Sequence, residues 1–97
     1  MRAKLVRYEK YPDVHGNTVE IKVWDVEATF DKPHGYKYSL VYIVEGERVV
    51  GYDNAEQKGD HRHYGNRTEP YKFESLHKLV EDFYFDVQRY REENYES

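Results

Sequence analysis

Apolar and polar residues alternate through the first half of the chain, and this alternation predicts strands. In residues 18–26 the valines and the isoleucine fall on one side and charged residues on the other, which is typical of a half-buried antiparallel strand. Residues 36–44 are rich in tyrosine and β-branched side chains, so we expect a central strand covered on both faces. Residues 3–8 and 48–52 predict two further strands, the second following a tight turn at Glu45-Gly46.

The hydrophobic period becomes helical after residue 75. Apolar residues then recur at intervals of three and four on a single stripe, formed by Leu76, Leu79, Val80, Phe83, Val87 and Tyr90. Ser75 is a suitable N-cap, and the pattern predicts a helix that runs to about Asn94. We therefore expect residues 1–97 to form a single α+β domain: a four- or five-stranded antiparallel sheet with one long C-terminal helix packed on it.

Residues 54–72 interrupt both patterns. They are polar and rich in turn-forming residues, and we expect a long loop, which in a compact domain is usually functional or disordered. A short fifth strand over Arg62-His63-Tyr64, at the edge of the sheet, is the alternative for part of this segment. The stretch from Asp53 to Glu69 is therefore the expected working part of the molecule. Trp24, opposite the apolar side of residues 18–26, either packs under the helix or marks a partner surface.

Charge and composition narrow the function classes. The net charge is −4, and residues 74–97, with seven acidic and three basic residues, account for all of it. An acidic chain argues against tight non-specific nucleic-acid binding but leaves room for a small cationic active site. The chain has no cysteine, which excludes disulfides and thiolate zinc sites. Without a long apolar run or a signal-peptide pattern, we expect a cytoplasmic protein that does not associate with membranes.

The run Lys58-Gly59-Asp60-His61-Arg62-His63 concentrates the candidate chemistry. Groups of this kind are costly to bury unless they are paired. Two imidazoles one residue apart place two groups that titrate near neutrality within reach of one substrate, so His61 and His63 can serve as base and acid. Lys58 or Arg62 can hold a phosphate, and Asp53, Asp60 or Glu69 can orient an imidazole.

The conformation of residues 59–65 decides which cation faces the histidines. An extended backbone would place His61 and His63 on one face and turn Arg62 away, which favours Lys58 or Arg67 as the phosphate partner. In a loop the choice stays open. We expect Arg67, Tyr52, Tyr64 and Glu69 to contact the substrate.

Two alternatives remain for the same run. His-x-His with a nearby carboxylate is also a metal-ligand arrangement, which Asp53, Asp60 or His34 could complete for zinc, manganese or nickel. The run could instead be a solvated loop whose charges pair with one another at little energetic gain. We favour the acid–base pair and expect neither a metal nor another cofactor.

Several strings in the chain resemble the TumE family of small toxins. They are Tyr36-Lys37-Tyr38-Ser39-Leu40, Val49-Val50-Gly51-Tyr52-Asp53-Asn54, the Lys58–His63 run, Pro70-Tyr71-Lys72-Phe73, and the helix around Leu79, Asp82 and Phe83. The resemblance implies the toxin component of a two-gene toxin–antitoxin system, with a helix-turn-helix antitoxin as its partner. A homodimer stays open.

The expected function is therefore a toxin that cleaves RNA without a metal, using His61 and His63 as an acid–base pair. A non-catalytic module that inhibits a cellular target is the alternative from another class. A metal-dependent hydrolase and a nucleotidyl or phosphoryl transferase are further alternatives.

Overall fold

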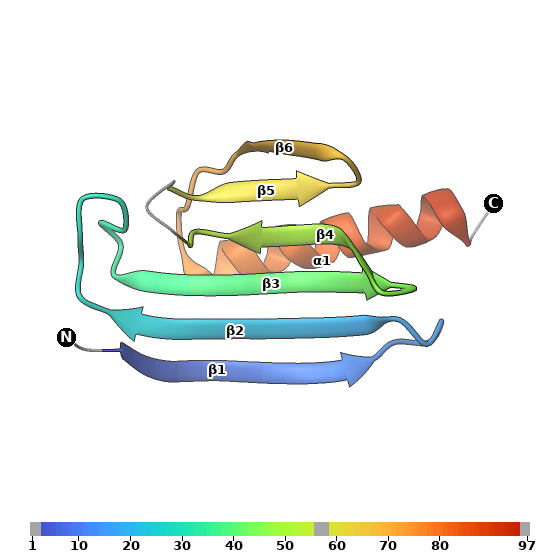
Figure 1. Cartoon of the computed structure of the whole chain (residues 1–97), viewed down its shortest axis with the longest axis horizontal. Coiled ribbons are helices and arrows are strands. Elements are labelled where there is room, and N and C mark those ends of the chain that lie inside the picture. The colour runs from blue at the N-terminus through green and yellow to red at the C-terminus, as the bar shows by residue number, and fades with distance from the viewer. Residues whose placement is uncertain (1–2, 56–58, 96–97) are drawn as a thin grey trace.

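The computed structural model describes residues 3–55 and 59–95, which form an antiparallel sheet with one helix on it (Figure 1). Six strands lie in chain order across the sheet: β1 (Ala3–Pro12), β2 (Thr18–Val26), β3 (Tyr36–Val44), β4 (Glu47–Asp53), β5 (His61–Tyr64) and β6 (Arg67–Pro70). The helix α1 (Leu76–Asn94) follows them. The α+β class and the single C-terminal helix are confirmed.

The expected number of four or five strands is wrong, because the sheet has six. Residues 54–72 do not form one long loop: β5 and β6 pair as a hairpin over their whole length. Gly65, at φ 60°, and Asn66 form the two-residue turn, and a Gly-Asn pair is a known hairpin signal. The alternative prediction of a short strand over Arg62-His63-Tyr64 is confirmed by β5, but β6 and not β5 forms the edge of the sheet. Backbone pairing stabilises this polar hairpin, whose strands show no hydrophobic alternation. β1 also continues beyond Tyr8 to Pro12.

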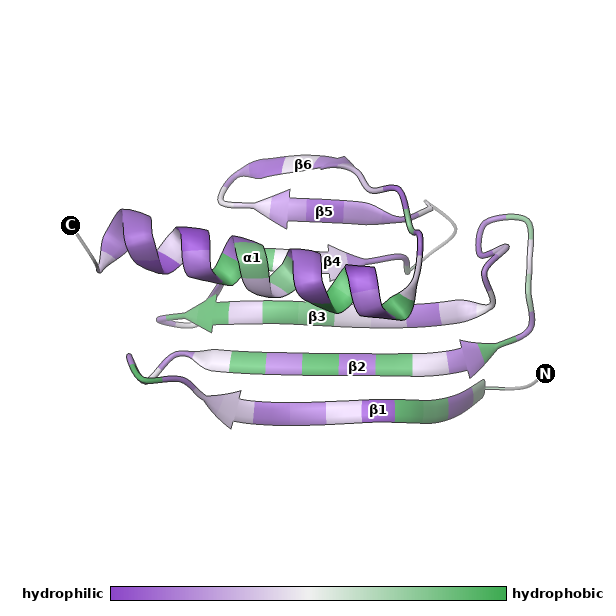
Figure 2. Ribbon diagram, turned by 180° about the vertical axis from the view of Figure 1, so that it is seen from behind, coloured by the Kyte–Doolittle hydropathy of each residue, from purple (hydrophilic) through white to green (hydrophobic). Residues whose placement is uncertain are grey.

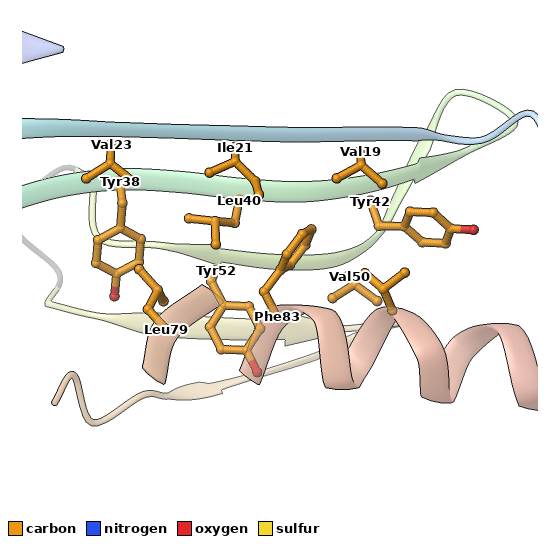
Figure 3. Close-up of a cluster of buried hydrophobic side chains, with 11 residues drawn as sticks. Val19, Ile21, Val23, Tyr38, Leu40, Tyr42, Val50, Tyr52, Leu79 and Phe83 are labelled. Atoms are coloured by element: carbon orange, nitrogen blue, oxygen red, sulfur yellow. The ribbon is translucent and has the colours of Figure 1, made fainter. Parts of the chain in front are cut away.

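The core lies between α1 and one face of the sheet (Figure 3). Ser75 caps the helix, since its Oγ accepts a hydrogen bond of 3.0 Å from the backbone N–H of Lys78. The predicted helical stripe is confirmed, and its central members Leu79, Phe83 and Val87 are fully buried. They pack against residues from β2, β3 and β4: Val19, Ile21, Val23, Tyr38, Leu40, Tyr42, Val50 and Tyr52.

In residues 3–55 and 59–95 no helix lies on the opposite face of the sheet, and we call this face the open face. Figure 1 shows the sheet with α1 behind it, and Figure 2 shows the same helix from its own side. The expectation that β3 is covered on both faces is therefore wrong: its alternate residues, such as Lys37 and Ser39, lie on the open face. Trp24 pairs with Lys37 across β2 and β3, so it also lies on the open face and not under the helix.

Candidate functional site

Strands β4, β5 and β6 bring four functional side chains together on the open face. His63 lies opposite Gly51 on β4 and Thr68 on β6, while Asp53 lies opposite His61. Residues directly opposite each other in antiparallel strands point to the same side of a sheet, so these side chains share one surface. The segment is extended, as one of the two alternatives from the sequence required, and alternate residues of a strand share a face. His61 and His63 therefore lie on the same side of the sheet.

Asn54 fixes the position of Asp53 at the end of β4. Its side chain is fully buried. Its Oδ1 accepts the backbone N–H of Tyr38 at 3.0 Å, and its Nδ2 donates to the Tyr36 carbonyl at 2.7 Å. The side-chain amide thus continues the hydrogen bonding between β3 and β4 beyond the end of β4. Asp53 is held where its carboxylate can reach the imidazole of the next strand.

His63 is oriented from both of its nitrogens. Its Nε2 lies 3.1 Å from Asp53 Oδ2, and its Nδ1 lies 3.0 Å from Thr68 Oγ1. A carboxylate can only accept, so Nε2 carries the hydrogen and Nδ1 is the acceptor in the neutral ring. This carboxylate–imidazole arrangement leaves Nδ1 as the basic nitrogen, where the hydroxyl of Thr68 now donates.

His61 is anchored differently and presents its other nitrogen. Its Nδ1 donates to the Gly59 carbonyl at 2.8 Å, and its Nε2 has no hydrogen-bond partner among the described residues. The two imidazole centroids are 5.6 Å apart. His61 also borders a pocket of about 230 Å³ together with Thr68 and Pro70. The site therefore combines an available imidazole nitrogen with space for a substrate group.

Among the described residues, Arg48 brings a cation to the candidate site, and the sequence pattern did not predict it. Strict alternation along β4 would place it beside Val50 on the core side. A β-bulge shifts the register, so that Val50 pairs with Tyr42 and Arg48 with Ile43 on the open face. Its side chain lies across Gly51, and its Nη1 is 3.7 Å from Asp53 Oδ2.

The surroundings of His63 favour its neutral form. Partial burial lowers its pKa, and the positive charge of Arg48 lowers that pKa further. The carboxylate of Asp53 acts in the opposite direction through its charge and its hydrogen bond, but the lowering effects outweigh it. At neutral pH this imidazole is therefore suited to accept a proton.

Arg62 lies on the opposite side of β5 from the histidines. Its guanidinium binds Asp86 of α1 through two hydrogen bonds, Nε to Oδ2 at 2.6 Å and Nη2 to Oδ1 at 2.8 Å, and also binds Glu69. The buried Tyr52 hydroxyl donates to Asp86 at 2.6 Å and accepts from Arg62 at 3.0 Å. Arg62 and Tyr52 thus join the β5 region to the helix, and their contacts leave neither facing the two imidazoles.

Removing Asp86 should destabilise the fold through these contacts. Asp86→Ala leaves a partly buried guanidinium and a buried phenol without their acceptor, so we expect a loss of about 2–4 kcal/mol. Glu81→Ala, on the exposed side of the same helix, is the control and should change stability by less than about 0.5 kcal/mol. Urea unfolding measures both, and equal losses in the two variants would contradict the assigned contacts.

The remaining predicted site residues lie around the site but are engaged elsewhere. Asp60 lines the pocket, yet its Oδ2 accepts hydrogen bonds from Tyr38 Oη at 2.7 Å and His34 Nε2 at 2.9 Å. The Tyr64 hydroxyl donates to Glu93 of α1. Arg67 pairs with Tyr64, on the helix side of the sheet. Lys58 lies outside the described residues.

The same contacts bear on the metal alternative. His34 Nε2 and Asp60 Oδ2 bind each other at 2.9 Å, and the same Asp60 oxygen also accepts from Tyr38. Within residues 3–55 and 59–95, no group of three or more His, Asp or Glu is arranged to hold a metal ion.

Comparisons with known proteins place the chain in a family. The family model described as Toxin TumE matches residues 2–91, nearly the whole chain. Searches of the curated proteins and of the solved structures give no significant match. In the part of the chain that the structure describes, no helix is both long and apolar enough to cross a membrane.

Proposed function

The chain belongs to the TumE family of toxins, and from the geometry of His61 and His63 we propose that it is an endoribonuclease that cleaves single-stranded RNA by transesterification without a metal ion. The observation that carries the proposal is that His61 and His63 lie side by side on the open face, with Asp53 fixing the tautomer of His63. Acid–base cleavage of RNA needs one group that accepts a proton and one group that donates a proton, both close to the same phosphate. The two rings, 5.6 Å apart, fit that requirement.

His63 is the general base of the proposed reaction. A 2′-hydroxyl replaces the Thr68 hydroxyl at Nδ1 and gives its proton to this nitrogen, while Asp53 stabilises the resulting imidazolium through Nε2. The 2′-oxygen then attacks the adjacent phosphorus. Since attacking and leaving oxygens must lie in line, a flexible single strand is a better substrate than a duplex.

His61 is the general acid. In the protonated ring the Nδ1 hydrogen is held by the Gly59 carbonyl, so the transferable proton is the one on Nε2, and His61 borders the pocket. That proton passes to the departing 5′-oxygen as the phosphorus–oxygen bond breaks. The products are a 2′,3′-cyclic phosphate and a 5′-hydroxyl, and every proton is accounted for between the two histidines.

Arg48 supplies the positive charge in this mechanism. A guanidinium can bind two phosphate oxygens at once and stabilises the charge that develops in the transition state. Its side chain is partly exposed and only loosely paired with Asp53, at 3.7 Å, so it can turn toward a phosphate. Arg62 is held by Asp86 and Glu69, and we leave it out of the proposed catalytic set.

Membership of a toxin family implies an antitoxin partner. We expect a helix-turn-helix protein encoded beside this chain. Binding of RNA in the cytoplasm would place toxin, antitoxin and substrate in one compartment.

Induced expression in bacteria tests the proposed function. The wild-type chain should arrest growth while cellular RNA is cut, and the His61→Ala/His63→Ala variant should do neither while still co-purifying with the antitoxin. His77→Ala is a matched control, because His77 is 89% exposed on α1 and should keep full toxicity.

Full toxicity of the double variant would eliminate the acid–base mechanism. Toxicity of the wild type with intact RNA would point to another reaction, with nucleotidyl or phosphoryl transfer next to be tested.

A further inference from the structure

The candidate site occupies one end of a longer surface. A row of directly paired residues crosses the open face from β5 to β1: His61, Asp53, Ser39, Lys22 and Tyr8. Neighbouring strands lie about 4.8 Å apart, so Lys22, three strands from His61, is about 14 Å away from it. A substrate bound at the two histidines can therefore continue across the sheet.

The charge of this face differs from that of the whole protein. Its paired strand residues include four cations, Lys10, Lys22, Lys37 and Arg48, against the carboxylates of Glu20 and Asp53. The face thus carries an excess of two positive charges, whereas the chain has a net charge of −4. The acidic total comes from residues 74–97, most of which lie in α1 on the other side of the sheet.

Aromatic rings lie among these cations. The Lys37 ammonium is 5.5 Å from the ring centre of Trp24, and the Lys22 ammonium is 6.0 Å from that of Tyr8. Tyr8 is 53% exposed. Alternating rings and ammonium groups are the chemistry that binds single-stranded nucleic acid, because bases stack on the rings and phosphates meet the cations.

We propose that the open face is the binding surface for single-stranded RNA, whose bases stack on Trp24 and Tyr8 and whose phosphates meet Lys22 and Lys37. The inference rests on the proposed function for its substrate, because the surface is continuous with the His61–His63 site. RNA fits better than an acidic protein partner because this surface offers a flat ring beside Lys22 and another beside Lys37. The cations hold the backbone without reading its sequence, and the rings favour single strands over duplexes because only unpaired bases can stack on them.

Binding can be measured without cleavage in the His61→Ala/His63→Ala background. The probe is a fluorescein-labelled, unstructured RNA about 12 nucleotides long, within the range that single-strand grooves hold. Adding Trp24→Ala should weaken binding about 5- to 100-fold, and Trp24→Phe should retain most of the affinity. Adding Lys22→Gln and Lys37→Gln should reduce the slope of log Kd against log salt by about 1.4, or about 0.7 for each lost phosphate contact.

Two control variants lie on α1. Phe85→Ala removes a ring that is 70% exposed, and Arg89→Gln removes an exposed cation, and neither should change RNA affinity. Unchanged affinity and salt slope in the folded open-face variants would overturn the proposal. If Trp24→Ala does not fold, the lysine variant and its salt slope decide the question.

Cleavage by the chain with both histidines intact separates this inference from the proposed function. Trp24→Ala should lower kcat/KM for the longer RNA and leave cleavage of a dinucleotide, which spans only the reacting bond, unchanged. If the protein cleaves RNA and Trp24→Ala leaves kcat/KM for the longer RNA unchanged, the proposed binding surface is refuted and the proposed chemistry is not. RNA binding that depends on Trp24 without any cleavage would support the surface and refute the chemistry. If the open-face variants lose antitoxin binding and keep RNA binding, the open face is a protein interface, and the proposal is overturned.

Discussion

Single substitutions of His61 or His63 by alanine are each expected to lower the rate of RNA cleavage by about 10²–10⁴-fold. This is the usual contribution of one general acid or base, and each ring supplies a separate proton transfer. Single-turnover cleavage of a short labelled RNA measures the rate. In urea unfolding, both variants should have the same free energy of unfolding as the wild type within about 0.5 kcal/mol, because neither ring belongs to the core. A loss below about tenfold in either variant would remove that residue from the mechanism.

The pH profile tests the role of His63. Activity should fall at acid pH, because a protonated His63 can no longer accept the proton of the 2′-hydroxyl. Burial and Arg48 lower the pKa of His63, so the acid limb should lie below the ordinary value of about 6.5. Arg48→Gln removes one lowering effect and should move this limb to higher pH. A limb that stays fixed, or moves to lower pH, would contradict the assignment of His63 as the base.

Phe83→Ala is expected to destabilise the fold by about 3–5 kcal/mol. Its ring is fully buried between α1 and the sheet and lies edge-on to Tyr52, at a centroid distance of 6.3 Å, so its removal leaves a cavity. Phe85→Ala, two residues along the same helix, removes a ring that is 70% exposed and should cost less than about 0.5 kcal/mol. Urea unfolding compares the two. A loss below about 1 kcal/mol for Phe83→Ala would place the helical stripe at an interface instead of a core.

The helix and the central strands could be predicted from sequence because burial leaves a periodic signal. Leu79 and Phe83 repeat at helical spacing, and Val19 and Ile21 alternate, because only one side of each element meets the core. The β5–β6 hairpin has no such signal. Its helix-side residues include Arg62, a cation whose partner Asp86 is far away in sequence. In the sequence, an ion pair between distant segments cannot be distinguished from two exposed charges, because the two residues meet only in the folded chain.

The candidate site could be predicted in part, because the spacing of residues along a strand determines which side chains share a face. His61 and His63 are two residues apart, so a strand places them on one face, and the sequence alone indicated their pairing. Arg48 was missed because its position depends on a bulge that reverses the side on which it lies. Asp60 was expected to orient His61 or His63, and its contacts with Tyr38 and His34 could not be predicted because these residues approach it only in the folded chain.

The ends of the cleaved RNA test the central claim most directly. The purified chain is incubated with a labelled single-stranded RNA in the presence of a metal chelator, and the products are analysed by mass spectrometry. The mechanism predicts 2′,3′-cyclic phosphate and 5′-hydroxyl ends, formed in the chelator and absent with the His61→Ala/His63→Ala variant. Products ending in 3′-hydroxyl and 5′-phosphate, or cleavage that the chelator abolishes, would contradict metal-free catalysis by His61 and His63.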